Sequence, residues 1–203
     1  MNRAANICLC LAWVFALCLW GRAGYAVEKW VKVENPDQLS EFSLRTANDR
    51  PFRRDDFMGH WSIVVLGYTS CPDVCPFVLG NLRAISREWL AQGKPLSRFP
   101  LQIIFVAVDP GRDTKRLSDY VQHFGDNVVG VTGDIVQLQR FANATGGAFE
   151  LGKANTHGDY SVKHSAFSTV ISPDAKVIAQ LNPPLPVTET IQFFRTLIAS
   201  TTP

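Results

Sequence analysis

Cysteine is scarce in this chain once its first 26 residues are set aside. Three of the five cysteines lie between Met1 and Ala26, and only Cys71 and Cys75 follow. A small exported scaffold that depends on disulfides uses more bridges than one close pair can supply. The pair is therefore interpreted as a redox or metal-binding device rather than as a structural staple.

The chain also lacks a basic run, internal repeats and low-complexity tracts. It has 20 Lys and Arg against 18 Asp and Glu, and loss of Arg3 and Arg22 with the first 26 residues would leave the two kinds equal in number. This neutral balance argues against nucleic acid as a partner. With 203 residues, of which 46% are hydrophobic, the chain suits one globular domain, which we predict at residues 27–203.

No apolar run reaches the roughly 20 residues that a membrane-spanning helix needs. The stretch from Ile7 to Trp20 follows the positive Arg3 and precedes the small-x-small pattern Gly24 to Ala26. We predict that residues 1–26 are a cleaved signal peptide, with an N-terminal anchor attached through residues 7–20 as the alternative. The protein is then exported, and is either periplasmic or attached to the outer face of the inner membrane.

The two remaining cysteines lie in the sequence Thr-Ser-Cys-Pro-Asp-Val-Cys-Pro, residues 69–76. An apolar run predicted to be a buried strand, Ser62 to Tyr68, precedes it, and a helical pattern follows. Pro76 suits the first helical position, so Cys75 is predicted to be the helix N-cap. A helix N-terminus favours the thiolate form, and the spacing permits either a disulfide or a two-thiolate metal site.

The order of the hydrophobic patterns predicts an α/β fold. Apolar runs predict strands at residues 42–46, 62–68, 101–108, 128–131, 166–172 and 176–181. Apolar residues at helical spacing predict helices up to Gly93, after an Asp113 cap, after an Asp134 cap and from Thr188. Residues 146–159 are expected to form a long functional or mobile loop. This order indicates a thioredoxin-like sandwich with a central mixed sheet flanked by helices.

One of the four histidines, His164, lies between the long loop and the strand predicted from Ala166. In a thioredoxin-like sheet the entrance to that strand faces the cysteine turn. Two thiolates and one imidazole form a soft, trigonal site suited to Cu(I), whereas structural zinc takes a fourth protein ligand. From residue type alone, a structural histidine remains the alternative. The others, His60, His123 and His157, are expected at the surface.

The chain resembles the Sco/SenC family of copper-binding proteins. The resemblance rests on the segments 67–76, 108–114, 131–133, 159–165 and 172–174, which occur in family order. The resemblance runs from about residue 42 to residue 198, which is most of the mature chain, and the joint specificity of the segments is high. The resemblance implies a thioredoxin fold and a copper metallochaperone rather than an enzyme.

The resemblance further implies copper bound by Cys71, Cys75 and His164, as Cu(I) with Cu(II) as the second state. It implies a role in supplying copper to, or reducing the thiols of, the binuclear copper site of cytochrome c oxidase. Expected partners are the copper-receiving subunit of a respiratory oxidase or another exported cuproprotein, and a thiol reductant. The alternative is a thiol-disulfide oxidoreductase that carries no copper and uses Cys71 and Cys75 as redox-active catalytic thiols. The oxidoreductase alternative is disfavoured because thioredoxin-type reductases usually have a cis-proline beside their cysteines, just before the strand that is predicted here from Ala166. This chain has no proline at that position.

Residues around these segments carry further expectations. Lys163 stands where the family usually has Asp, and it is expected to place a cation beside the site. Asp109 and Arg112 are expected to form a turn and helix start capped by Asp113, with an interaction near the cysteines as the alternative. Tyr160 is expected to pack rather than to take part in the chemistry.

Overall fold

The computed structural model describes residues 29–92 and 96–201. The predicted signal peptide at residues 1–26, its attachment through residues 7–20 and the helix stop at Gly93 lie outside these ranges. Within them, none of the helices has both the length and the apolar character needed to cross a bilayer.

The helices and strands follow the predicted alternation. The strands are β1 Trp30–Lys32, β2 Leu44–Thr46, β3 Pro51–Phe52, β4 Trp61–Gly67, β5 Leu101–Ala107, β6 Val128–Thr132, β7 Phe149–Leu151, β8 Val162–His164, β9 Ser168–Ile171 and β10 Val177–Leu181. The helices are the short 3-10 turns η1 Arg54–Phe57 and η2 Leu96–Arg98, and the α-helices α2 Val74–Ala91, α3 Pro110–Asp113, α4 Leu117–Gln122, α5 Ile135–Ala144 and α6 Val187–Thr201.

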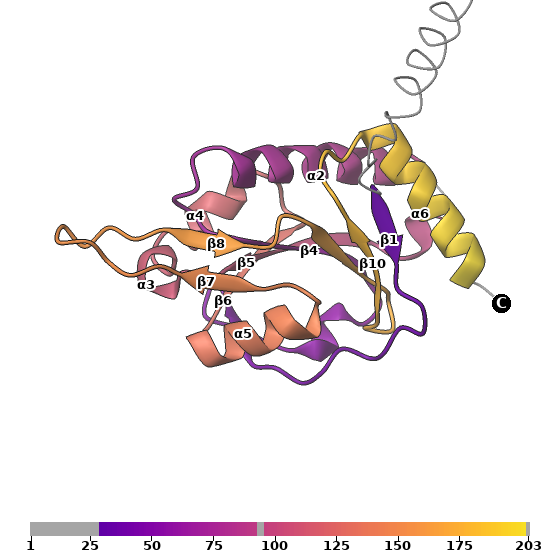
Figure 1. Cartoon of the computed structure of the whole chain (residues 1–203). Coiled ribbons are helices and arrows are strands. Elements are labelled where there is room, and N and C mark those ends of the chain that lie inside the picture. Colours follow the sequence, from indigo (N-terminus) through magenta and orange to yellow (C-terminus); the bar gives the residue numbers. More distant parts are fainter. Residues whose placement is uncertain (1–28, 93–95, 202–203) are drawn as a thin grey trace, which may run out of the picture.

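Within the described residues, eight strands form one mixed sheet in the order β1-β10-β9-β4-β5-β6-β2-β3. Strands β4, β5 and β6 are parallel, β9 pairs antiparallel with β4, and β10 pairs antiparallel with β9. Helices α2, α4 and α6 lie on one side of the sheet and α5 lies on the other (Figure 1). This confirms the predicted thioredoxin-like α/β sandwich.

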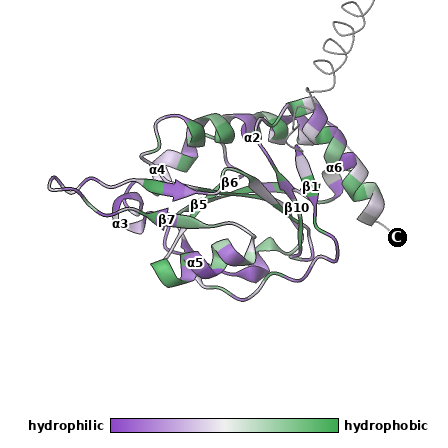
Figure 2. Cartoon of the chain, viewed as in Figure 1, coloured by the Kyte–Doolittle hydropathy of each residue, from purple (hydrophilic) through white to green (hydrophobic). Residues whose placement is uncertain are grey.

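The sheet is covered on both faces, because its central strands β4 and β5 are mostly apolar and are buried along almost their whole length. Ile63 and Val65 of β4 belong to the core beneath α2 and α6, whereas Val64 and Leu66 belong to the core beneath α5. Successive side chains of a strand point to opposite faces, so a continuous apolar run supplies two cores at once. Figure 2 shows hydrophobic residues along the central strands, and both hydrophobic (green) and hydrophilic (purple) residues on the helices. The sandwich thus fixes the end of β4, where the cysteine turn begins.

Two predictions about connections were wrong. Residues 146–159 are not one irregular loop, because β7 lies within them and pairs antiparallel with β8 to form a separate two-stranded hairpin. This hairpin projects beyond the main sheet at the left of Figure 1. The strand predicted from Ala166 begins two residues later, at Ser168.

The start of α2 also differs from the prediction. Asp73 is its N-cap and Val74 its first residue, so Cys75 lies inside the first turn and is not the cap. The first N–H groups of a helix have no intrahelical acceptor, so Pro76 costs no hydrogen bond in this turn. The amide of Phe77 donates the first recorded helical bond, to the Asp73 carbonyl at 3.2 Å.

Asp113 does not cap a helix. The residue that caps α3 is Asp109, and Asp113 is the last residue of that helix, with its side chain buried. By contrast, Asp134 caps α5 as predicted, because its carboxylate accepts a hydrogen bond from the Gln137 amide at 2.9 Å. The same residue type thus serves in two roles, and only one was recognised from the sequence.

Candidate metal and redox site

The cysteine turn joins the end of β4 to the start of α2. Cys71 lies in the turn and is half-buried, and its amide donates to the Tyr68 carbonyl at 3.2 Å. Cys75 lies one helical turn onward and is only 1% exposed. Neither cysteine is in a disulfide. The turn therefore presents one accessible and one covered sulfur.

The two thiols have opposite acidities, which the sequence did not predict. Burial raises the pKa of Cys75 to about 12, and its contact with Cys71 adds to the rise. Burial also opposes ionisation of Cys71, but hydrogen bonds from the Cys75 amide and thiol and from the Asp73 and Val74 amides lower the pKa of Cys71 below its ordinary value of 9.0. The helix N-terminus thus activates Cys71 alone.

The cover over Cys75 comes from its neighbours in the sheet. A Cβ atom added at Gly67 would come within 2.9 Å of the Cys75 sulfur and within 2.6 Å of Cε2 of Phe105. Both distances are shorter than real contacts permit. Glycine at the end of β4 therefore lets the sulfur pack directly against the strand, which is why this thiol is sheltered from water.

His164 is the last residue of β8, and its ring reaches the cysteine turn. Its Nε2 atom lies 4.0 Å from the sulfur of Cys75, and its Nδ1 atom lies 2.9 Å from the Ser165 carbonyl oxygen. A carbonyl oxygen only accepts, so in the neutral ring Nδ1 carries the proton and Nε2 presents a lone pair toward the sulfur. The ring of Tyr68 packs edge-on against this imidazole, with centroids 6.1 Å apart. The structure confirms that His164 lies at the cysteine turn.

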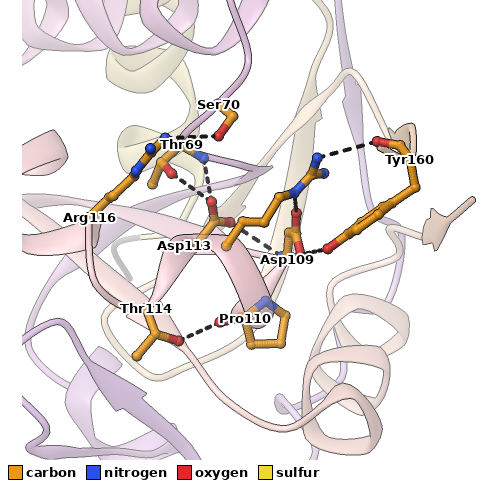
Figure 3. A network of polar contacts seen from close by, with 9 residues as sticks. Thr69, Ser70, Asp109, Pro110, Asp113, Thr114, Arg116 and Tyr160 are labelled. Carbon is orange, nitrogen blue, oxygen red and sulfur yellow. Dashed lines mark hydrogen bonds and ion pairs between the residues drawn. The ribbon is translucent and has the colours of Figure 1, made fainter. Parts of the chain in front are cut away.

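A buried polar network lies behind the cysteine turn (Figure 3). Asp113 accepts hydrogen bonds from the amide and the hydroxyl of Thr69, at 2.8 and 2.6 Å. Asp109 forms an ion pair with Arg112 and accepts from the Tyr160 hydroxyl at 2.6 Å. The interaction between Asp109 and Arg112 that the sequence left as an alternative is present. For the other hydrogen bonds of this network, the sequence offers one signal, which is the pair of acids Asp109 and Asp113, four residues apart after a buried strand.

Tyr160 is more than a packing residue. The Arg112 guanidinium lies 3.9 Å above the centre of its ring and donates to its backbone oxygen at 3.3 Å. The hydrogen bond to Asp109 raises the pKa of the Tyr160 hydroxyl, because the neutral phenol is the donor. Tyr160 therefore packs against Arg112, as expected, and in addition joins the polar network.

Three other histidines and Lys163 contribute no contact to the sulfurs. His60 and His123 hydrogen-bond through Nδ1 to the carbonyls of Met58 and Asp119, at 3.0 and 2.6 Å. His157 is exposed in the loop between β7 and β8. Lys163 precedes His164 on the same strand and is exposed, and alternation directs the two side chains to opposite faces. Adjacency in sequence therefore does not place this cation at the sulfurs.

The donor atoms suit a soft metal ion. Two sulfurs and an imidazole nitrogen with a free lone pair are ligands that Cu(I) prefers. Within residues 29–92 and 96–201, no three His, Cys, Asp or Glu side chains already stand close enough together to hold a metal ion. The ligand types thus fit copper, while the arrangement is open rather than closed around a metal position.

Comparison with known proteins gives one family. A model of the SCO1/SenC family matches residues 32–199. The chain is 34% identical over 148 residues to a Stutzerimonas stutzeri protein described as "Putative copper-binding protein", covering 72% of this chain and 70% of that one. It is 35% identical over 136 residues to the Bos taurus "Protein SCO2 homolog, mitochondrial", covering 66% of this chain and 50% of that one. The chain thus spans only half the length of this mitochondrial relative.

Solved structures share the fold. Yeast Sco1 with copper bound superposes with a TM-score of 0.74 at 22% identity, over 83% of this chain and 92% of that one. BsSco, described as having a disulfide switch and as a member of the Sco family of cytochrome c oxidase assembly proteins, superposes with a TM-score of 0.61 at 19% identity. That match covers 82% of this chain and 96% of BsSco. At these identities the similarity establishes the fold.

Proposed function

Since this chain belongs to the SCO1/SenC family, we propose that it is an exported copper metallochaperone that binds copper through Cys71, Cys75 and His164. Its recipient is the copper-receiving subunit of a respiratory oxidase, at the binuclear copper site of cytochrome c oxidase. Support comes from a copper-bound family structure with this fold and from the oxidase-assembly role stated for BsSco. Copper is here the cargo, a soft cation that is transferred from this protein to its recipient.

One observation carries the proposal: the Nε2 lone pair of His164 faces the Cys75 sulfur at 4.0 Å while Nδ1 is held by Ser165. Metal-binding histidines are commonly oriented in this way, with the second ring nitrogen fixed by a carbonyl or carboxylate. Cys71, which precedes α2, supplies the more acidic and more accessible thiol. The ligands come from two segments separated by 89 residues, so a metal bound here would tie the β7–β8 hairpin to the cysteine turn.

The direct test is the copper content of the reduced protein, by anaerobic Cu(I) titration. We expect one copper per chain, no tight binding in Cys71→Ser or Cys75→Ser, and weaker binding in His164→Ala. His123→Ala is the matched control because His123 also bonds a carbonyl through Nδ1 but faces no cysteine. Full copper retention in Cys71→Ser would refute the ligand assignment, and loss in His157→Ala would add a ligand.

The redox state of the cysteines should control loading. Cu(I) needs both sulfurs as thiolates, so a Cys71–Cys75 disulfide and bound Cu(I) exclude each other. Reduced protein should bind Cu(I) and should then resist alkylation at both thiols. Equal Cu(I) uptake by oxidised and reduced protein, or unchanged alkylation after loading, contradicts the chaperone function.

A thiol-disulfide oxidoreductase is the second candidate, and the unequal thiols favour it. An accessible thiolate at Cys71 can attack a partner disulfide, forming a mixed disulfide and releasing one partner thiolate. Cys75 then attacks the sulfur of Cys71, giving the internal disulfide and the second partner thiol, so two electrons and two protons pass to the partner. A thiol reductant must reset the pair. Disulfide reduction at the same rate with and without copper would favour this candidate.

Export can be tested separately. The short apolar stretch from Ile7 to Trp20 and the small residues Gly24 and Ala26 motivate the proposal. Intact-mass measurement on protein from an exporting bacterial host should show a chain starting near Val27. A membrane-retained product that still carries Met1 would instead support an anchor.

A further inference from the structure

The hairpin that carries His164 has little structure of its own to hold it in place. Its strands β7 and β8 contain three residues each and pair only with each other within the described part of the chain. An isolated two-stranded hairpin is at best marginally stable in water. Partly buried Phe149 and Val162 pack against the core beneath α5. Apolar packing on this scale does not specify the position of a ring to a fraction of an ångström, so polar contacts must do so.

The polar contacts pass through Tyr160, four residues before His164. Its hydroxyl donates to Asp109 at 2.6 Å, and its backbone oxygen accepts from Arg112 at 3.3 Å. The guanidinium also lies over its ring. Asp109 is fully buried, and hydrogen bonds to a buried charged acceptor are stronger than those between neutral groups. Tyr160 is therefore held at three points by Asp109, which is the N-cap of α3, and by Arg112, three residues later.

The same helix holds the cysteine turn. Asp113, the last residue of α3, accepts from both the amide and the hydroxyl of Thr69, two residues before Cys71. Its second oxygen accepts from the Asp109 amide at 3.3 Å, which ties the two carboxylates to one backbone turn. Figure 3 shows Tyr160 at Asp109 and Thr69 at Asp113, on the two sides of α3. Two segments far apart in sequence are thus fastened to one short block.

From this geometry we infer that α3 is a positioning block, in which Asp109, Arg112 and Asp113 set the spacing between the His164 imidazole and the cysteine turn. The inference rests on the proposed copper function, because the spacing matters only if sulfur and nitrogen bind one metal ion. Within the described residues, no hydrogen bond or ion pair joins Asp109, Arg112 or Asp113 to the three proposed ligands, so the block residues position them through Tyr160 and Thr69.

Tyr160→Phe is the sharpest test, because it removes one hydroxyl and keeps the ring. Loss of a partner that orients a metal ligand typically lowers metal affinity about 10- to 100-fold, and we expect a loss of about tenfold in Cu(I) affinity by competition with a chromophoric chelator. The effect must act through the imidazole. In a His164→Ala background, Tyr160→Phe should therefore leave the remaining two-thiolate affinity unchanged.

Tyr120→Phe is the matched control. The Tyr120 hydroxyl is buried and has no hydrogen-bond partner within the described residues, and its ring packs against Phe105. Its removal should leave Cu(I) affinity within about twofold of wild type. An equal loss of affinity in Tyr120→Phe and Tyr160→Phe would show a general effect of removing a buried hydroxyl and would overturn the inference.

A readout without copper separates this inference from the proposed function. In metal-free Tyr160→Phe, amide hydrogen exchange should accelerate about tenfold at the hairpin amides of Gly152 and Ser165, whose acceptors are the carbonyls of Ser161 and Ala148. The Val65 amide in β4 should keep its wild-type rate. If hairpin exchange is faster in the variant but the wild-type protein binds no Cu(I), the proposed copper function is refuted. The block formed by α3 then still anchors the hairpin structurally. Unchanged hairpin exchange, or equal affinity losses with and without His164, would overturn the positioning role.

Discussion

The unequal thiols give a prediction that needs no metal. At pH 8 a thiol with the pKa of about 12 found for Cys75 is ionised in only about one molecule in ten thousand. Cys71, whose pKa lies below 9.0, is ionised in at least about one molecule in ten. The thiolate populations thus differ by at least about a thousandfold.

Part of that difference is offset by intrinsic reactivity. A thiolate becomes more nucleophilic as its pKa rises. With a Brønsted coefficient near 0.45, a gap of about three units, the smallest that the two pKa shifts allow, makes the Cys75 thiolate about 20 times more reactive. At this smallest gap the net preference for Cys71 is about 50-fold. Burial of Cys75, only 1% exposed, hinders the reagent and acts in the same direction.

The assay is timed iodoacetamide alkylation of reduced, metal-free protein, with each site followed by peptide mass spectrometry. Cys75→Ser reports Cys71 alone, and Cys71→Ser reports Cys75 alone. In urea, where the fold no longer distinguishes the thiols, the two rates should converge. Native rates within about threefold of each other, or a faster Cys75, would refute the assignment of Cys75 as the protected thiol.

Three further predictions concern stability. Leu82 is fully buried on α2, and Leu82→Ala should lower the free energy of unfolding by about 2–5 kcal/mol, measured by urea titration. The control is Leu90→Ala on the same helix, where the side chain is 71% exposed. This change should alter the free energy of unfolding by less than about 0.5 kcal/mol. Gly67→Ala should cost about 1–3 kcal/mol, because its new methyl group meets Phe105 and the Cys75 sulfur; a wild-type melting temperature would contradict that contact. Burial raises the pKa of Asp113 above 3.8 despite its bonds from Thr69, so the folded state holds this proton more tightly than the unfolded state. Wild type should therefore lose stability relative to Asp113→Asn as the pH rises from about 3.8 through the folded pKa, and a constant difference between their melting temperatures from pH 3 to 7 would argue against it.

The sequence predicted the sandwich because its central strands and α2 carry strong local patterns. The run predicted at residues 62–68 is β4 shifted by one residue, and the apolar residues of α2 at helical spacing are buried as expected. The hairpin was missed because β7 has only three residues and follows two glycines, so no pattern of useful length marks it. The start of α2 was misplaced because proline is tolerated at more than one position of a first turn.

The sequence predicted the three candidate ligands, but it did not predict the acidities of the two thiols. Residue types and a family resemblance were enough to select Cys71, Cys75 and His164, and the structure places His164 beside Cys75. The opposite acidities depend on a contact between Cys75 and Gly67, which are eight positions apart and on different elements. A helix N-terminus alone predicts two activated thiols, and burial decides that only one is activated.

Asp113 shows why such contacts escape a reading of the sequence. An acid just before an amphipathic helical pattern is the usual signature of an N-cap, since its oxygen can accept from the first free amides. Here the chain has already turned into α3 at Pro110, so the carboxylate points inward and accepts from Thr69, 44 residues earlier. Both arrangements satisfy a carboxylate with a backbone N–H, and the local sequence is compatible with either. The two arrangements differ in which backbone amide would otherwise lack a hydrogen-bond acceptor in the folded protein. The cysteine turn, constrained by two prolines, leaves the Thr69 amide free, and this long-range requirement determines where Asp113 points.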